Sequence, residues 1–71
     1  MVNMISSWRK KRELSQEQLA AEIGSYQANI CQYEIGIKTP NVRTALKIAR
    51  ALGCGLDDLF YEKGEENVYN G

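Results

Sequence analysis

The fold of this 71-residue chain is decided by residues 16–35, which read QEQLAAEIGSYQANICQYEI. Two helices that cross steeply through a tight turn need a small side chain at the crossing, a glycine in the turn and large apolar residues beneath. Ala20, Gly24 and Ile30 meet these three demands. The spacing therefore predicts two short helices joined by a tight turn, with the polar side of the second helix facing outward.

Local signals set the limits of both helices. Ser15 is well placed as an N-cap, and Gln18 three residues later completes a capping box. Gly24 is expected to end the first helix because glycine readily adopts the left-handed conformation. Apolar residues at helical spacing predict the second helix over 27–35, and Gly36 is expected to end it.

Further helices are predicted on both sides of this unit. The apolar spacing predicts one helix from about Met4 to Arg12, and another from Val42 to Leu52 with Asn41 as its N-cap. A short fifth helical turn is predicted around Asp57 to Tyr61, where two acidic residues suit the positive end of the helix dipole. Five short helices with short links indicate a compact all-α domain.

Length and composition limit the chain to one domain. Chains of this size bury only about 60% of the surface that the unfolded form exposes, so a separate catalytic lobe is not expected. We assign residues 1–62 to the helical domain and residues 63–71 to a polar C-terminal tail that is expected to be flexible. No apolar run approaches the roughly 20 residues of a membrane span, and residues 1–8 do not resemble a secretion signal, so we expect a cytoplasmic protein without a membrane partner.

The charges are unevenly distributed although nine basic residues balance nine acidic ones. Through Gly53 the chain has eight basic and four acidic residues, whereas beyond it Lys63 alone faces five acidic residues. This separation predicts that one end of the molecule suits phosphate groups and the other does not. The alternative for the basic run Arg9–Arg12 is a solvated helix face.

Catalysis and metal binding find little support in the residue types. The chain has no histidine, no Gly-rich phosphate loop and no nucleophile beside a base, so we expect neither an enzyme nor a bound cofactor. Cys31 and Cys54 alone do not make a zinc site, so no metal is expected. We expect these two residues to be small buried hydrophobic groups rather than a disulfide.

Four segments agree in order and spacing with one known family. They are LSQEQLAAEIG (14–24), ICQYE (30–34), GIKTPNVRTALKIARALG (36–53) and LDDLF (56–60). On these segments the chain, over about Ile5 to Phe60, resembles the Cro/cI-like, or XRE-type, family of helix-turn-helix regulators. The resemblance implies a five-helix lambda-repressor-like fold and a sequence-specific, double-stranded-DNA-binding transcriptional regulator, expected to be a repressor.

The resemblance implies that the helix over 27–35 enters the major groove and reads bases. The amide of Gln27 would fit adenine N6 and N7, and Ala28 would touch a thymine methyl group. Gln32 would read or brace a further position, and Asn29 is a further base-contacting candidate. The alternative for Gln27, Asn29 and Gln32 is that they are solvated helix residues.

Contacts to the DNA backbone are implied for five residues: Gln16, Tyr26, Lys38, Asn41 and Arg43. Gln16, which begins the first helix of the motif, would hold a phosphate and also brace Gln27. For Tyr26 the alternative is a packed or capping residue. Arg9 and Glu34 match an internal ion pair of the family, so Arg9 is expected to be partly architectural.

One such domain contacts only half of a DNA site, so we expect a homodimer on a palindromic operator. The apolar residues near the C-terminus are the expected dimer interface: Leu56, Leu59, Phe60 and Tyr61. The alternative is that the first three only close the core. The alternative function is a protein-interaction module, an adaptor or antitoxin-like, on the same fold.

The chain departs from the family pattern at two places. Glu13 stands where glycine is usual, so the turn after the first helix must accommodate a side chain. The helix over 27–35 begins without the arginine or serine that is common in the family. The target sequence of a relative therefore does not transfer to this chain.

Overall fold

The computed structural model describes residues 2–61, so the predicted tail at 63–71 lies outside the described residues. The described elements follow the chain in this order: β1 (Val2–Asn3), α1 (Ile5–Lys11), α2 (Gln16–Ile23), α3 (Gln27–Ile35), α4 (Val42–Leu52), α5 (Leu56–Leu59) and β2 (Phe60–Tyr61). The fold is all-α, as predicted, with one addition: β1 and β2 form a two-stranded antiparallel pair.

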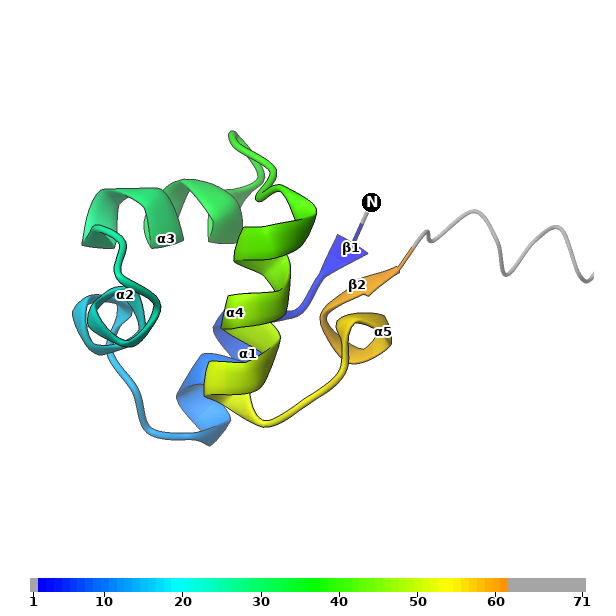
Figure 1. Cartoon of the computed structure of the whole chain (residues 1–71), viewed down its shortest axis with the longest axis horizontal. Helices are drawn as coiled ribbons and strands as arrows, with labels where there is room; N and C mark the ends of the chain where they lie inside the picture. Colours follow the sequence, from blue (N-terminus) through cyan, green and yellow to red (C-terminus); the bar gives the residue numbers. More distant parts are fainter. Residues whose placement is uncertain (1, 62–71) are drawn as a thin grey trace, which may run out of the picture.

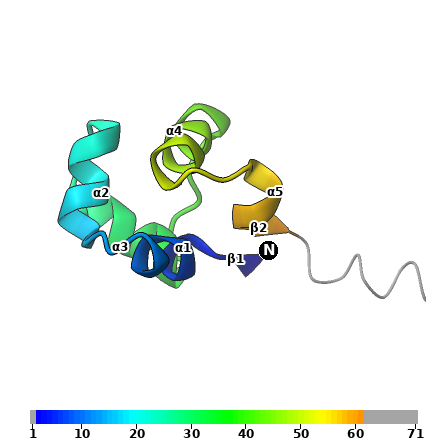
Figure 2. The same cartoon turned by 90° about the horizontal axis from the view of Figure 1, so that it is seen from below.

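Helix α3 lies along one edge of the molecule, and α2 crosses steeply beneath it (Figure 1). Helix α4 runs through the middle of the domain, with α1 behind it. Helix α5 and the strand pair lie on the side of α4 away from α2, as the view from below also shows (Figure 2). This arrangement leaves α3 and the loop that follows it at the periphery.

The predicted caps are present at the ends of α2 and α4. The Oγ of Ser15 accepts a hydrogen bond from the Gln18 backbone N–H at 3.0 Å, and the Gln18 side chain accepts one from the Ser15 N–H at 2.7 Å. Gly24 ends α2 in the left-handed conformation, with φ of 69°. The Oδ1 of Asn41 accepts from the Thr44 backbone N–H at 2.8 Å. These local bonds replace partners that the first turns of both helices lack.

The core lies between α2, α3 and α4 and is closed by α1 and α5. Six large aliphatic side chains are fully buried: Ile5, Leu19, Ile30, Ile48, Leu52 and Leu59. Ala20 is also buried, which agrees with its predicted place at the helix crossing. Burying one such aliphatic side chain contributes about 1.5–3 kcal/mol, so these residues are the main source of the fold's stability.

The strand pair was not predicted, and it shortens the last helix. Helix α5 ends at Leu59, because Phe60 and Tyr61 are extended and pair with Asn3 and Val2. The Met4 backbone N–H continues this pairing by donating to the Leu59 carbonyl at 2.7 Å. The prediction of a helical turn to Tyr61 was therefore wrong in its end, because backbone bonds to the N-terminus compete with helical ones.

Glu13 occupies the left-handed region that glycine would take more easily, with φ of 59°. It is the single non-glycine residue among those described with a positive φ. The turn is held from both sides: the Glu13 N–H donates to the Lys10 carbonyl at 3.0 Å, and Arg9 Nη1 donates to the Leu14 carbonyl at 2.8 Å. The turn thus accommodates a side chain at a position whose conformation favours glycine.

Candidate nucleic-acid interface

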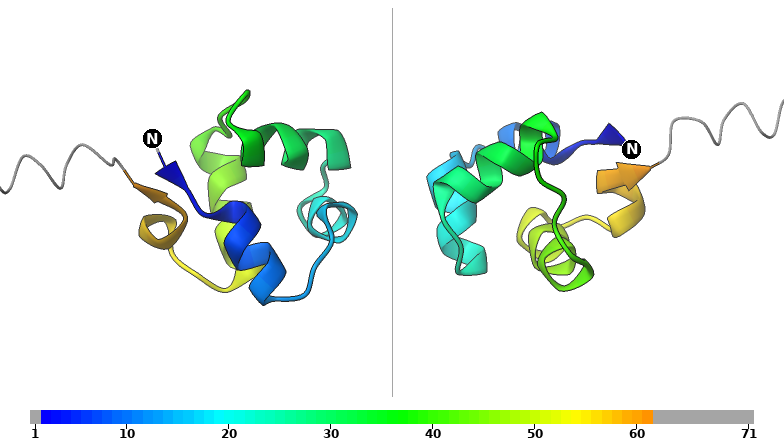
Figure 3. Two further views of the ribbon diagram at one scale, coloured as in Figure 1. Left: turned by 180° about the vertical axis from the view of Figure 1, so that it is seen from behind. Right: turned by 90° about the horizontal axis from the view of Figure 1, so that it is seen from above.

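The outward face of α3 is the candidate interface, because no described element covers it in the view from above (Figure 3). Ile30 and Tyr33 on the opposite side of α3 are buried in the core. Gln27 and Ala28 are exposed, and Tyr26 just before the helix is 78% exposed. The predicted orientation of the helix is therefore correct.

Gln16 and Gln27 lie side by side across the helix crossing. The Nε2 of Gln27 donates to the Oε1 of Gln16 at 2.6 Å, and the Nε2 of Gln16 donates to the Oε1 of Glu34 at 3.0 Å. The brace between the two glutamines is thus present. The bond to Glu34 was not predicted, because the two residues are 18 positions apart and on different helices.

The expected ion pair between Arg9 and Glu34 joins α1 to α3. The Nε of Arg9 lies 2.7 Å from Oε2 of Glu34, and its Nη2 donates to Oε1 at 3.3 Å. The two side chains are only 12% and 7% exposed. Water has little access to this partly buried pair, so removing one partner would leave a charge without compensation, and the pair ties the interface to the body of the protein.

Asn29 and Lys38 are linked to each other beside the interface. The Nδ2 of Asn29 donates to the Oγ of Ser25 at 3.0 Å, and its Oδ1 accepts from the Nζ of Lys38 at 3.3 Å. The half-buried Asn29 therefore connects the turn before α3 to the loop after it. Ser25 was overlooked in the sequence, although a serine four residues before an asparagine on a helix face is a recognisable signal.

The remaining predicted contact residues lie at helix starts or on the helix side. Asn41 is exposed and caps α4, and Arg43 is exposed in the first turn of that helix. Tyr26 is the N-cap of α3, but its side chain makes no capping hydrogen bond, so its capping alternative is wrong for the side chain. Gln32 is half-buried on α3.

The basic run at the end of α1 does not form part of this face. The end of α1 lies at the opposite side of the molecule from α3 (Figure 1). There the Nε of Arg12 donates to the Leu52 carbonyl at 2.8 Å, and the Nζ of Lys11 lies 4.8 Å from the centre of the Trp8 ring. Lys11 and Arg12 therefore contact Trp8 and the Leu52 carbonyl, away from the outward face of α3.

One of the four predicted dimer residues is fully buried within the protomer. Leu59 is 0% exposed and packs within the core, so a contact between Leu59 and a second copy is excluded. Leu56 and Phe60 are half-buried and pack against that core. Both also line an apolar groove of about 230 Å³, whose other lining residues are Thr39, Pro40, Val42, Ala45 and Asp57. The backbone of Tyr61 is held in β2.

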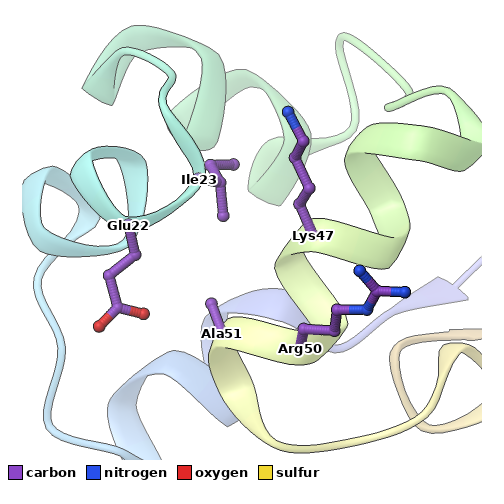
Figure 4. Close-up of a pocket in the computed structure, with 5 residues that line it drawn as sticks. All are labelled: Glu22, Ile23, Lys47, Arg50 and Ala51. Carbon is purple, nitrogen blue, oxygen red and sulfur yellow. The ribbon is translucent and has the colours of Figure 1, made fainter.

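A second hollow of about 510 Å³ lies between the end of α2 and α4. Its polar side chains do not point toward a common position where a ligand could be held (Figure 4). Its charged lining residues are Glu22, Lys47 and Arg50, and their charged ends point in different directions (Figure 4). Over residues 2–61, no group of three or more His, Cys, Asp or Glu side chains is placed to hold a metal ion.

The two cysteines are not joined by a disulfide. Cys31 and Cys54 are half-buried free thiols. Burial raises the pKa of the Cys54 thiol, the Asp58 carboxylate raises this pKa further, and the Arg12 guanidinium opposes both effects. None of the helices described within residues 2–61 has the length and apolar character needed to cross a membrane.

Comparisons with known proteins agree with this geometry. A helix-turn-helix family model matches residues 5–59. The chain is 36% identical over 66 residues to an HTH-type transcriptional regulator of Archaeoglobus fulgidus, a match that covers 93% of this chain and 94% of that protein. It is 32% identical to one of Methanocaldococcus jannaschii, covering 93% of this chain and all of the other.

A solved structure shares the same fold. It is the P22 c2 repressor protein in complex with a synthetic operator, which is 32% identical and superposes with a TM-score of 0.72. The match covers 75% of this chain and 80% of the repressor chain. With the family match and these relatives, the steep crossing of α2 and α3 identifies the chain as a member of the Cro/cI-like (XRE-type) family of helix-turn-helix transcriptional regulators.

Proposed function

We propose that this protein is a cytoplasmic, sequence-specific DNA-binding repressor that acts as a homodimer on a palindromic operator. Each protomer would insert α3 into the major groove. The observation that carries this proposal is the uncovered face of α3, on which the exposed amide of Gln27 is held by Gln16. The similar P22 c2 repressor was solved in complex with a synthetic operator, which supports DNA as the partner of this chain.

Base reading is assigned to the outward side chains of α3. After its bond to Gln16, Gln27 still has Oε1 and one Nε2 hydrogen for a base edge. This pair fits the N6 donor and N7 acceptor of adenine. The methyl side chain of Ala28 is exposed beside it and suits the methyl group of thymine. Asn29 in the same turn and Gln32 in the next turn are both half-buried and are further base-contacting candidates.

Phosphate contacts are assigned to the groups around α3. The first turns of α2 and α3 supply backbone N–H groups, and no side chain caps the start of α3. Gln16 and Tyr26 lie at these two helix starts. On the other side, Lys38, Asn41 and Arg43 are exposed in the loop and the first turn of α4. These contacts add affinity without sequence choice.

The dimer contact is assigned to the apolar groove between α4 and α5. Val42 is 71% exposed at its rim, and Leu56 and Phe60 line it. A two-fold symmetric pair uses the same patch on both subunits, so a second copy would cover this groove with its own Val42. Val42→Glu should abolish the dimer in sedimentation experiments, whereas the uncharged, similarly shaped Val42→Thr should keep it. A monomeric wild type would contradict this assignment.

The base-reading role is tested by selection from a random DNA library, followed by titration of point variants of the selected site. Gln27→Ala should lose about 1–3 kcal/mol of discrimination at one base pair of each half-site, whereas Lys38→Ala should weaken binding to all sequences alike. Equal loss across every variant site for Gln27→Ala would rule out its reading role.

A protein-binding function is the second candidate, and one observation favours it. Ile35 and Ile37, at the end of α3 and in the next loop, are 62% and 74% exposed. Exposed apolar side chains are typical of protein-contact surfaces. Absence of any salt-sensitive duplex binding at low ionic strength would favour this alternative over DNA recognition.

A further inference from the structure

Four side chains from α1, α2 and α3 form one continuous hydrogen-bonded chain that ends at the proposed base-reading amide. It runs from Arg9 to Glu34, from Glu34 to Gln16 at 3.0 Å, and from Gln16 to Gln27 at 2.6 Å. We propose that Glu34 is a positioning residue that sets which way the amide of Gln27 faces, and thereby favours adenine over guanine. This inference rests on the proposed function of α3.

The charge of Glu34 determines which group donates and which accepts in each of these hydrogen bonds. A carboxylate accepts hydrogen bonds only, and a guanidinium donates only. Gln16 must therefore turn its Nε2 toward Glu34, because the opposite orientation would place two acceptor oxygens together. The Oε1 of Gln16 then faces Gln27, which donates a hydrogen bond to it from Nε2.

Burial makes the hydrogen-bonded series rigid at Arg9 and Glu34, whereas Gln27 at its other end stays accessible. Arg9 and Glu34 are 12% and 7% exposed, so water competes little for their hydrogen bonds. Gln16 is half-buried and Gln27 is exposed. A preference set by a protected ion pair is thus passed through one glutamine to a side chain on the DNA-facing surface.

The orientation of Gln27 decides which base edge it fits. With Nε2 bound to Gln16, the groups left over are Oε1 and one N–H, an acceptor and a donor that match adenine N6 and N7. With the amide reversed, two N–H donors would face outward and match the two acceptors of guanine, O6 and N7. Glu34 excludes the second arrangement, although it does not itself reach the DNA face.

The central test compares binding to the selected operator with binding to the same operator carrying guanine in place of the adenine at the Gln27 position. The wild type should prefer adenine by about tenfold or more. Glu34→Gln, whose amide can donate as well as accept, should allow both orientations and bring the ratio close to one. An unchanged adenine preference in Glu34→Gln would overturn the inference.

Two matched variants separate orientation from a general loss of structure. Gln16→Ala removes the hydrogen bonds that link Glu34 to Gln27 but leaves the Arg9–Glu34 ion pair. It should reduce the adenine preference as Glu34→Gln does. Arg9→Lys weakens the two-point ion pair but leaves the carboxylate, so it should lower thermal stability and keep the preference. In a Gln27→Ala background, Glu34→Gln should have no further effect on the ratio. A drop in the ratio there would show that Glu34 acts by another route and contradict the proposal.

A measurement without DNA keeps this inference separate from the proposed function. In the free protein, the side-chain amide signals of Gln27 in the NMR spectrum should shift in Glu34→Gln, and their hydrogens should exchange faster. Unchanged amide signals would refute the positioning role. If the wild type binds no duplex but these signals do shift, the proposed function fails while the hydrogen-bonded chain stands.

Discussion

Glu13 is the residue at which the backbone departs most clearly from what its side chain prefers, since its φ is 59°. The left-handed conformation costs a non-glycine residue roughly 1–2 kcal/mol, whereas glycine loses about 0.5–1 kcal/mol of additional chain entropy on folding. The strain is larger than the entropy loss. Glu13→Gly should therefore stabilise the protein by about 0.5–1 kcal/mol, measured as a rise in Tm of a few degrees in thermal unfolding.

A second glutamate on a helix provides the control. Glu22 is exposed within α2, where glycine is unfavourable. Glu22→Gly should destabilise by about 1 kcal/mol. If both variants lower the Tm, the turn at Glu13 is not strained.

The Cys54 thiol should stay protonated to a higher pH than an ordinary cysteine. Burial is the largest cause that raises its pKa, and the Asp58 carboxylate acts in the same direction against Arg12. The thiolate is the species that alkylating reagents attack. In a Cys31→Ser variant, the rate of alkylation by iodoacetamide should therefore rise at higher pH in the folded protein than in the same chain unfolded in urea.

The same shift has a consequence for stability. The folded pKa of Cys54 is raised above the unfolded value, so the unfolded chain loses its proton first as the pH rises. The contribution of Cys54 to stability is therefore fully present below the unfolded pKa and is lost as the pH rises through the folded pKa. Coincident alkylation profiles for folded and unfolded chains would contradict the shift.

At the scale of the helices, α4 starts at a residue with two separable roles. Asn41 caps the helix through Oδ1 at 2.8 Å from the Thr44 nitrogen, and its exposed side chain is also a proposed phosphate contact. Asn41→Ala should lose the cap and destabilise by about 1 kcal/mol. Asn41→Asp should keep the cap and the stability, because a carboxylate also caps and suits the helix dipole.

DNA affinity distinguishes the two roles. The negative charge of Asn41→Asp should repel phosphate and weaken binding on every sequence, although the fold is unchanged. Chemical denaturation and DNA titration of both variants check this. Asn41→Asp with full affinity would remove Asn41 from the backbone contacts.

The limits of the two middle helices show why short-range signals sufficed at this scale. The predicted bounds of α3 and α4 are those observed, because Gly36 and Gly53 end them in the left-handed conformation. Capping bonds join residues three positions apart, so the sequence contains both partners side by side. At the C-terminus the same reasoning failed, because Phe60 pairs with Asn3 from the other end of the chain.

For the molecule as a whole, the arrangement of elements divides the basic residues into two groups. Lys38 is bonded to Asn29 of α3, whereas Lys11 lies against Trp8 at the end of α1. Each phosphate that a basic side chain neutralises adds about 0.9 to the slope of log affinity against log salt. Lys38→Gln should therefore lower the slope by about 2 in the dimer complex, because both protomers would leave one phosphate unneutralised.

Lys11→Gln is the matched control for charge. It removes the same charge from the far side of the protein and should leave the salt slope unchanged. Both variants could instead lower the salt slope equally. The overall electrostatic field of the protein, rather than direct contact with phosphate, would then determine the affinity.

The sequence by itself determined the helix-turn-helix unit and the family, because periodicity, caps and turn glycines act over a few residues. The tertiary structure alone decided which distant groups meet. Glu34 bonds to Gln16 across 18 positions, and Arg12 bonds to the Leu52 carbonyl across 40. Leu59 turned inward and β1 paired with β2 for the same reason. Such contacts depend on how whole helices cross, and no local pattern specifies that geometry.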